Sequence, residues 1–589
     1  MAPGVIGKVF KEFALTLAGA VILSGFTALT LSPVMCTKLL KNQTLGHHGS
    51  GHASSGFWGY LSYTIEKIFL KCDVLYLRAV TASLRKKTLI LILSAVFSIS
   101  SGLVGWYGLK KELSPVMDEG LLSGRFIPAP SMNLTYIKKR ASQIDALLKK
   151  HPDIRTRLIT LQSGDQSLTK SALSPWESRS RPCADIVKEI NADAESLLGL
   201  TYTARCVNSS LLSTRESQYP LSFEILTHKS AEDLIKMGRI VRRHLKKWPG
   251  VVRLDDSETI QMDEYEIIIN RDRIDQLGID PEEISSTLYT LVRGSNIGTF
   301  EKDARICPVH VRIAPASVSS IEGIASIFVR GKDANNKYVM VPLSEIITYS
   351  IKKGDSSIDH SSKNRSFKID AAITPGASLP DTYLEFKEHI MANVLPPEYS
   401  LEPSGELESY FKEQGSIYLI LGLALVFIFL VMAAQFESVR DPLIILISVP
   451  LALGGALLSL LFLKSGSINV YSQIGLITLI GLITKHGILL VDFANQAKEQ
   501  GVSKTVAILE SCQLRLRPIL MTTFAMVLGA IPLAIATGAG SEARRQIGVV
   551  IVGGMSIGTL FTLFVVPILY VVFSRPAKQR IQNVPGAKG

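Results

Sequence analysis

The sequence is poor in the residue patterns that carry enzymatic or metal chemistry. It has six cysteines among 589 residues, and none of them shows the spacing of a metal site. It also contains no nucleophile–base arrangement and no phosphate-binding loop, so we expect neither an enzyme nor a bound cofactor. Cys183, Cys206 and Cys307 fall in one long polar region, where one disulfide is possible; a Cys183–Cys206 bond is among the options that the pattern leaves open.

Charged residues are absent from seven long stretches of the chain. Each stretch approaches or exceeds the roughly 20 residues that cross a bilayer core, and 47% of all residues are hydrophobic, which is unusual for a soluble protein of this length. The sequence therefore predicts a polytopic α-helical membrane protein with about seven spans, the fifth of which continues through Lys485 to about residue 495. The uncharged runs are 13–37, 88–109, 414–436, 442–463, 465–484, 518–541 and 546–574.

The net charge of +12 is distributed in a way that argues against nucleic-acid binding. Basic residues gather between the first two spans, between the fifth and sixth, and after the last, and alternating threading puts these three groups on one side of the membrane. That side is the cytoplasm by the positive-inside rule, which leaves the region 110–413 outside, in the periplasm of a bacterial cell. The residues are Lys38, Lys41, Lys67, Lys71, Arg78, Arg85, Lys86, Lys87, Lys498, Lys504, Arg515, Arg517, Arg575, Lys578 and Arg580.

The predicted segments follow one another in a simple order. A flexible glycine- and histidine-rich linker at 46–56 and an amphipathic interfacial helix at 57–84, with Phe57 and Trp58 at the membrane surface, lie between the first two spans. The full division is a span at 1–37, a cytoplasmic linker and interfacial helix at 38–87, a span at 88–109, a periplasmic porter-type head at 110–413, a five-span bundle at 414–574 and a cytoplasmic tail at 575–589.

The head contains an internal repeat of strand–helix–strand units. LLKKHPDIR and HLKKWPGVVR each end a helical pattern, at Pro152 and Pro249, and a third copy is plausible at 381–404. Such units form α+β sandwiches, either as duplicated scaffold or as a substrate-handling head with clefts. The segment GDQSLTKSALSPWESRSRP, residues 164–182, could be a flexible loop at a cleft mouth. The apolar faces of the first two helices are Ile137, Ala141, Ile144 and Leu148, then Leu234, Met237, Val241 and Leu245.

Lys485 is the most unusual residue of the membrane region. A charged side chain at the bilayer centre costs about 2.5–3.5 kcal/mol, so it persists when it pairs with a buried carboxylate or moves ions. Thr478 and Asp492 share its helical face, but Asp492 is about 10 Å away along the axis, too far to pair. No other predicted span contains an acidic residue, so the sequence provides no counterion for Lys485.

Arg515 and Thr522 lie seven residues apart where the chain enters the next span. Arg515 could extend to the cytoplasmic boundary, and Thr522 could bind a backbone carbonyl. Together with a central lysine on the adjacent helix, they could instead relay or gate protons. Both interpretations remain open on these residues alone.

Six long segments resemble the drug-and-hydrophobe branch of the resistance-nodulation-division (RND) efflux transporters, and the resemblance runs essentially end to end. GLITKHGILLVDFANQ resembles that branch's tenth membrane helix and RLRPILMTTFAMVLGAIPL its eleventh. GAGSEARRQIGVVIVGGMSIGTLFTLFVVPILY resembles the following loop and twelfth helix, and FALTLAGAVILSGFTALTLSPVMC the sixth. NRDRIDQLGIDPEEISSTL and AAITPGASL are similar to porter-domain signatures.

The resemblance implies a proton relay. In such pumps the lysine matched by Lys485 pairs with two aspartates on the fourth membrane helix, and Arg515 and Thr522 match a nearby arginine and threonine. His486 stands where the family usually has an asparagine, so His486, Thr478 and Asp492 are further candidates for relay or gating. The family's metal-exporting branch lacks the lysine, so heavy-metal export is disfavoured, and no bound metal is expected.

The resemblance also implies partners. The family's proteins have two similar halves, and this sequence matches the last span of the first half and all of the second, with Met1 falling between the fifth and sixth helices. We therefore expect a C-terminal portion of an exporter of small hydrophobic or amphiphilic substrates, working with an N-terminal half that carries the aspartate pair. A trimer, a periplasmic adaptor, an outer-membrane channel and inner-membrane localisation are implied as well. The alternative is a truncated, transport-dead or regulatory membrane fragment.

Overall fold

The computed structural model contains two compact units, which are described separately below. One comprises Met1–Ile127, Lys138–Asp255 and Asp359–Gly589, and the other Pro128–Ile137 and Asp256–Ile358. The structure describes residues 4–39, 57–128, 134–161, 167–197, 200–207, 219–254, 261–314, 320–332, 337–355, 359–374, 377–463 and 465–575. The predicted linker at 46–56 and most of the tail at 575–589 lie outside these residues.

Within the described residues, seven helices are long and apolar enough to cross a membrane, and they coincide with the seven uncharged runs. Two boundaries differ from the prediction. The fourth run is divided at Ile447 into α12 and α13. The sixth membrane helix begins before the run at 518–541, because the polar residues that precede the run continue the helix, and it ends at Ala534. The bounds are α1 (Gly4–Leu39), α3 (Lys87–Gly108), α11 (Gly405–Phe436), α12 (Arg440–Leu446), α13 (Ser448–Phe462), α14 (Val470–Glu499), α15 (Lys504–Ala534) and α16 (Ser541–Phe573).

The helix expected at 57–84 is α2 (Phe57–Arg85). The Tyr76 hydroxyl donates to the Leu563 carbonyl of α16 at 2.8 Å, and the buried Val80 packs in the same apolar cluster as α14, α15 and α16. The placement of α2 at a cytoplasmic surface stays a prediction.

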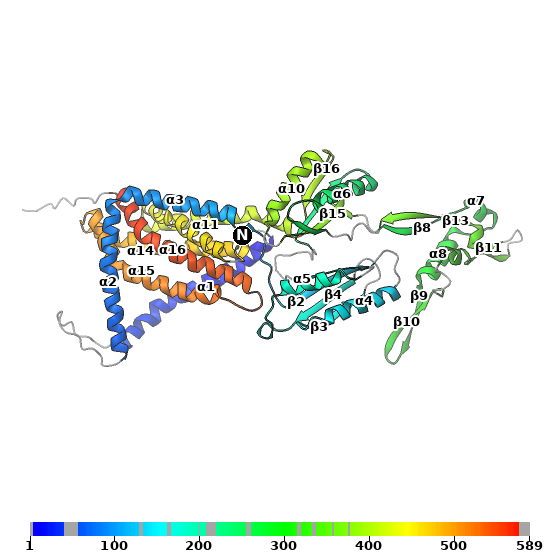
Figure 1. Cartoon of the computed structure of the whole chain (residues 1–589), viewed down its shortest axis with the longest axis horizontal. Helices are drawn as coiled ribbons and strands as arrows, with labels where there is room; N and C mark the ends of the chain where they lie inside the picture. Colours follow the sequence, from blue (N-terminus) through cyan, green and yellow to red (C-terminus); the bar gives the residue numbers. More distant parts are fainter. Residues whose placement is uncertain are drawn as a thin grey trace, which may run out of the picture. The chain divides into compact units, whose positions relative to one another are not determined.

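Helix α16 packs against α13, α14 and α15, and α14, α15 and α16 lie side by side in Figure 1. Its glycines allow this close approach. A Cβ atom built at Gly554 would lie 2.2 Å from a Leu479 methyl of α14, and one at Gly558 would lie 2.6 Å from the Ala452 Cβ of α13. The core of the bundle therefore depends on small residues at these contacts.

The first head sheet has the strand order β3-β4-β2-β5 and is covered by α4 and α5. The first predicted unit is present as β2, α4 and β3, and Ile137, Ala141, Ile144 and Leu148 are all buried as expected. The loop predicted at 164–182 is wrong, since Ser167–Leu173 forms the inner strand β4 between β2 and β3. Bounds are β2 (Leu121–Pro128), α4 (Leu134–Lys149), β3 (Ile154–Thr160), β4 (Ser167–Leu173), η1 (Trp176–Ser178), α5 (Cys183–Ala194) and β5 (Leu200–Cys206).

A disulfide joins Cys183 at the start of α5 to Cys206 at the end of β5. It is the pairing that the sequence left open, and it ties the helix to an edge of the first sheet. Cys307 is a free thiol.

The second head sheet combines the second and third predicted units. The strand order is β14-β15-β6-β16, with β7 also pairing with β15, and α6 and α10 pack on the same apolar core as β6. The expected face of α6 is confirmed, since Leu234, Val241 and Leu245 are buried and Met237 packs against them. Bounds are β6 (Leu221–Thr227), α6 (Ala231–Lys246), β7 (Val251–Leu254), β14 (Asp359–Ser361), β15 (Asn364–Ile373), α10 (Leu379–Asn393) and β16 (Tyr399–Pro403).

The smaller of the two compact units, Pro128–Ile137 and Asp256–Ile358, consists mainly of three antiparallel strand pairs, β8–β13, β9–β10 and β11–β12. Its core is formed by aliphatic residues such as Ile284, Leu343 and Ile346, which are fully buried. Bounds are β8 (Gln261–Ile269), α7 (Arg271–Gln276), α8 (Pro281–Leu288), η3 (Tyr289–Arg293), β9 (Ser295–Lys302), β10 (Arg305–Val311), α9 (Ile321–Ala325), β11 (Phe328–Lys332), β12 (Tyr338–Pro342), η5 (Leu343–Glu345) and β13 (Ile347–Asp355).

A short segment connects α3 to the first head sheet within the larger unit. It begins with β1 (Lys110–Lys111), which pairs in parallel with β17 (Ser467–Ile468) just before α14. It ends at Asp118, whose carboxylate accepts hydrogen bonds from Arg179 at 2.9 Å, from Gly120 N–H at 3.0 Å and from Cys183 N–H at 2.6 Å. One buried carboxylate thus fixes where the head begins.

Candidate functional site

The predicted site lies on α14, whose first turn is held by a capping box. The Asn469 side chain accepts from the N–H groups of Tyr471 and Ser472, and the Ser472 hydroxyl is 2.9 Å from the Asn469 N–H in return. Capping satisfies N–H groups that would otherwise be unpaired at a helix start. The long apolar helix that carries Lys485 therefore has a fixed starting point.

Lys485 stands on the open side of α14. Its side chain is exposed, and it forms no ion pair or hydrogen bond with any other described residue. Near the far end of α14 the buried Asp441 of α12 accepts from the Asn495 amide at 3.2 Å. Asn495 is ten residues beyond Lys485, about 15 Å along a helix axis, so Asp441 is not its counterion.

Thr478 and Asp492 share the side of α14 that includes Lys485, but neither is bound to it. The Thr478 hydroxyl donates to the Ile474 carbonyl of its own helix at 2.8 Å. The Asp492 carboxylate accepts from Gln496 one turn later at 2.9 Å. Both side chains are half-buried, and their relay or gating role stays a prediction.

His486 points to the packed side of α14 and is fully buried. Its Nε2 lies 3.5 Å from the Thr522 hydroxyl and 3.4 Å from the Thr523 hydroxyl, both on α15. Its Nδ1 lies 3.3 Å from the Thr559 hydroxyl on α16. The imidazole therefore joins three helices through threonine hydroxyls.

The backbone contacts of the threonines favour one tautomer of His486. The Thr522 and Thr523 hydroxyls both donate to the Ile519 carbonyl, at 3.0 and 2.8 Å, and with their one hydrogen engaged there we infer that they accept from the ring. Nε2 therefore carries the hydrogen, and Nδ1 accepts from Thr559. This arrangement satisfies both ring nitrogens of a neutral imidazole without a charge inside the bundle.

Arg515 is placed apart from Lys485. Its guanidinium carbon lies 4.8 Å from the centre of the Phe493 ring on α14, which is a cation–π geometry. Its Nε is buried with no hydrogen-bond partner among the described residues. The structure thus brings Thr522 to His486 and Arg515 to Phe493, and it brings neither to Lys485.

Two residues of this site were missed in the sequence. Thr523 and Thr559 are buried, and their hydroxyls lie 3.3 Å from each other as well as near His486. The intramembrane threonines Thr478 and Thr522 were singled out from the sequence, but these two were not. Thr559 stands between Ser556 and Thr562 in the apolar sequence of α16, so its spacing alone does not distinguish it from them.

Metal binding finds no support in the part of the chain that the structure describes. It contains no group of three or more histidine, cysteine or acidic side chains that could hold a metal ion.

Comparison with known proteins shows two similarities that bear on function. A model of the AcrB/AcrD/AcrF family matches residues 1–574. A protein of Haemophilus influenzae described as an uncharacterized transporter is 34% identical over 576 residues, which cover 96% of this chain and 54% of the relative. The chain therefore spans about half the length of this curated relative.

Proposed function

Because the chain belongs to the AcrB/AcrD/AcrF family of membrane transporters, we propose that it is the C-terminal portion of a proton-driven exporter of the bacterial inner membrane. Its cargo is small hydrophobic or amphiphilic compounds, and residues 110–413 form its periplasmic head. The observation that carries the proposal is Lys485, a cation on the open side of an apolar helix with no acidic partner among the described residues.

The partner of Lys485 is a carboxylate pair supplied from outside this sequence, on an N-terminal half. An unpaired charge in the membrane is costly, and the match to about half of a longer relative leaves room for such a half. Protonation of the pair releases Lys485, α14 shifts, and the head subdomains open and close their clefts.

Arg515 and Thr522 assist the same proton relay from α15. The contact of Thr522 with His486 supports its share in the relay, whereas the stacking of Arg515 on Phe493 fixes a positive charge beside the same helix. A proton moving through 100 mV supplies about 2.3 kcal/mol, and a tenfold gradient of a neutral solute costs about 1.4 kcal/mol. One proton per cycle is therefore sufficient.

A lysine substitution tests the relay. Lys485→Ala should reduce export of a fluorescent hydrophobic dye to the level of cells without the transporter, at equal protein level. Lys412→Ala is the matched control, since Lys412 is an exposed lysine of α11 paired with Glu408, and it should export normally. Normal dye export by Lys485→Ala would refute the role of Lys485.

Co-purification tests the assembly and the alternative. A tag on the C-terminus, gentle extraction from the native cell and mass spectrometry should recover a near-stoichiometric membrane partner with an intramembrane aspartate pair. An adaptor, an outer-membrane channel and a trimeric mass are expected as well. The alternative is a transport-dead or regulatory fragment, and the absence of a partner for Lys485 among the described residues is compatible with it as well. Recovery of the chain alone would support this alternative and refute the split exporter.

A further inference from the structure

The start of α14 is bound to the segment that leads into the head. β1 pairs in parallel with β17, and the pairing continues in two backbone hydrogen bonds. Glu112 N–H donates to the Ile468 carbonyl at 3.2 Å, and Val470 N–H donates to the Leu113 carbonyl at 3.3 Å. Because α14 also carries Lys485, these few bonds connect the helix of the candidate relay to the head.

A buried polar network holds this junction. The Ser467 hydroxyl accepts from the Asn469 amide at 2.8 Å and from the Gln546 amide of α16 at 3.2 Å. These three residues are at most 1% exposed. Both lone pairs of the Ser467 oxygen are then occupied, and its hydroxyl hydrogen is donated in a hydrogen bond to Glu112 Oε1. A proton on the Glu112 carboxyl therefore has to sit on Oε2.

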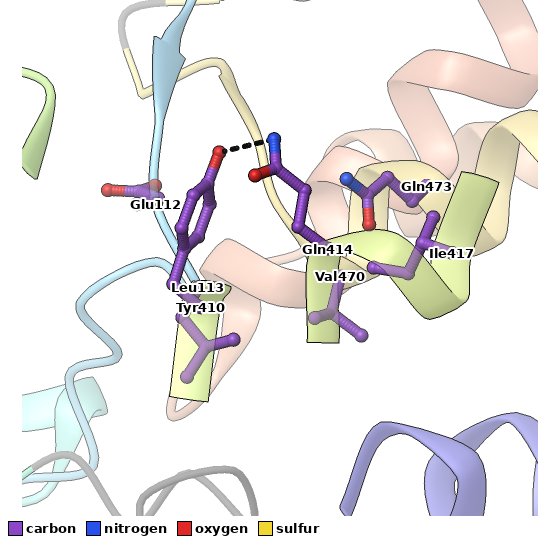
Figure 2. A pocket seen from close by; sticks show the side chains of 7 residues that line it. All are labelled: Glu112, Leu113, Tyr410, Gln414, Ile417, Val470 and Gln473. Atoms are coloured by element: carbon purple, nitrogen blue, oxygen red, sulfur yellow. Dashed lines mark hydrogen bonds between the residues drawn. The ribbon is translucent and has the colours of Figure 1, made fainter. Parts of the chain in front are cut away.

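Figure 2 shows the cavity beside Glu112, which has room for about one water molecule. Tyr410 and Gln414 from α11 and Gln473 from α14 line it as well, and Gln414 donates to the Tyr410 hydroxyl at 3.3 Å. Gln473 Oε1 is buried and has no hydrogen-bond partner among the described residues. A protonated Glu112 adds a donor to a cavity that contains this free acceptor.

Few charged groups act on Glu112 from the neighbouring elements. Lys110 of β1 is 3.9 Å from Oε2 and favours the carboxylate, whereas Glu406 of α11 acts against it. Lys111 is held by Asp381 of α10 at 3.4 Å. Burial outweighs the hydrogen bond from Ser467 and the charge of Lys110, and it raises the pKa of Glu112 above its ordinary value.

We propose that Glu112 is a proton-operated latch between α14 and the head. Uptake of a proton by the carboxyl holds β1 against β17, and loss of the proton releases them. The proposal rests on the proposed function, since it makes the connection between the helix of Lys485 and the head depend on protonation.

The direction follows from linkage. In the closed latch Glu112 is half-buried, with its side chain 19% exposed, and it binds a proton more tightly than it does when the latch is open to water. Protonation therefore favours closure, and closure weakens as the pH rises through the raised pKa of the closed state. For each pKa unit by which Glu112 in the closed latch exceeds Glu112 in the open latch, the equilibrium constant for closure changes by up to tenfold across the transition.

Hydrogen–deuterium exchange of the full chain, purified with whatever partners remain bound, tests the latch between pH 5 and 8. After correction for intrinsic rates, the Glu112 and Val470 amides should be better protected at low pH and lose up to tenfold protection per unit through the transition. Glu112→Gln should remain protected throughout. Glu398→Gln removes an exposed carboxylate paired with Lys229 and should behave as the unmodified protein. Protection independent of pH in the unmodified protein, or an unchanged pH dependence in Glu112→Gln, overturns the proposal.

Ser467→Ala gives a second test that does not alter the carboxyl group. Without the Ser467 donor the carboxylate is less well stabilised, so the transition should move to higher pH; an unmoved transition contradicts the latch. These readouts need no transport. A failed latch therefore leaves the dye-export result for Lys485→Ala unaffected, and normal export by Lys485→Ala leaves the exchange data standing.

Discussion

Removal of the Thr559 hydroxyl should loosen the helix bundle measurably. Thr559→Val keeps the shape of the side chain but leaves His486 Nδ1, inside a fully buried ring, without its donor. A buried polar atom without a partner costs about 1–3 kcal/mol. Since 1.4 kcal/mol is a factor of ten, transient opening of the bundle should become about fivefold to a hundredfold more frequent.

Cys512 provides the assay for this opening. It is a free thiol on α15, fully buried in the bundle core, so it can react with a maleimide only when the bundle opens. Its labelling rate at fixed temperature, followed by mass spectrometry to separate it from the exposed Cys36 and Cys72 and the half-buried Cys307, should rise by the factor given above in Thr559→Val.

Thr562→Val is the matched control. Thr562 is also fully buried on α16, but its hydroxyl donates to the Gly558 carbonyl of its own helix at 2.8 Å. Its loss leaves no side chain of another helix unpaired, so Cys512 labelling should change less than about twofold, under 0.5 kcal/mol. Equal labelling rates in the Thr559→Val and Thr562→Val variants would refute the inference that His486 joins the three helices.

Two further substitutions test packing and the buried ion pair. Gly558→Ala places a Cβ 2.6 Å from an alanine of α13, whereas Gly529→Ala meets nothing within 4 Å; we expect a loss of about 1–3 kcal/mol for the first, seen as a lower melting temperature, and no loss for the second. Asp118→Asn removes the charge partner of Arg179, a side chain with no exposed surface, and should cost about 3–5 kcal/mol. Proteolysis of the head should then quicken, while Asp145→Asn, at a more exposed ion pair, should show little change.

The helices that could be predicted are those whose signal is local. A long uncharged run is by itself the signal for a membrane helix, and the apolar pattern around Lys485 predicted one helix that extends through it. The structure confirms this, since α14 runs from Val470 to Glu499. Ile144 and Val241 were assigned to buried faces from a repeat of three to four residues, and both are fully buried. Lys485 was expected to lack a counterion in this chain, and no described acid lies near enough to serve.

The features that could not be predicted depend on residues distant in sequence. Ser167–Leu173 contains mostly small and polar residues and was interpreted as part of a loop, but it becomes a strand because β2 and β3 pair with it on both sides. Likewise, the contacts of His486 with Thr523 and Thr559 depend on how α15 and α16 are oriented about their own axes in the bundle. The sequence around these threonines does not predict that orientation.

The position of Lys485 on α14 gives a mechanical reason why the site and the latch belong together. The helix has 30 residues and is about 45 Å long, with Lys485 near its middle and Asn469 as its cap. On its packed side His486 is tied to α15 and α16 through hydroxyls, and a Cβ at Gly475 would approach Val550 to 3.0 Å. These contacts hold α14 against α15 and α16. If a change of charge at Lys485 moves α14, as the proposed function requires, the bonds of Glu112 and Ser467 at its start connect that movement to the entrance of the head.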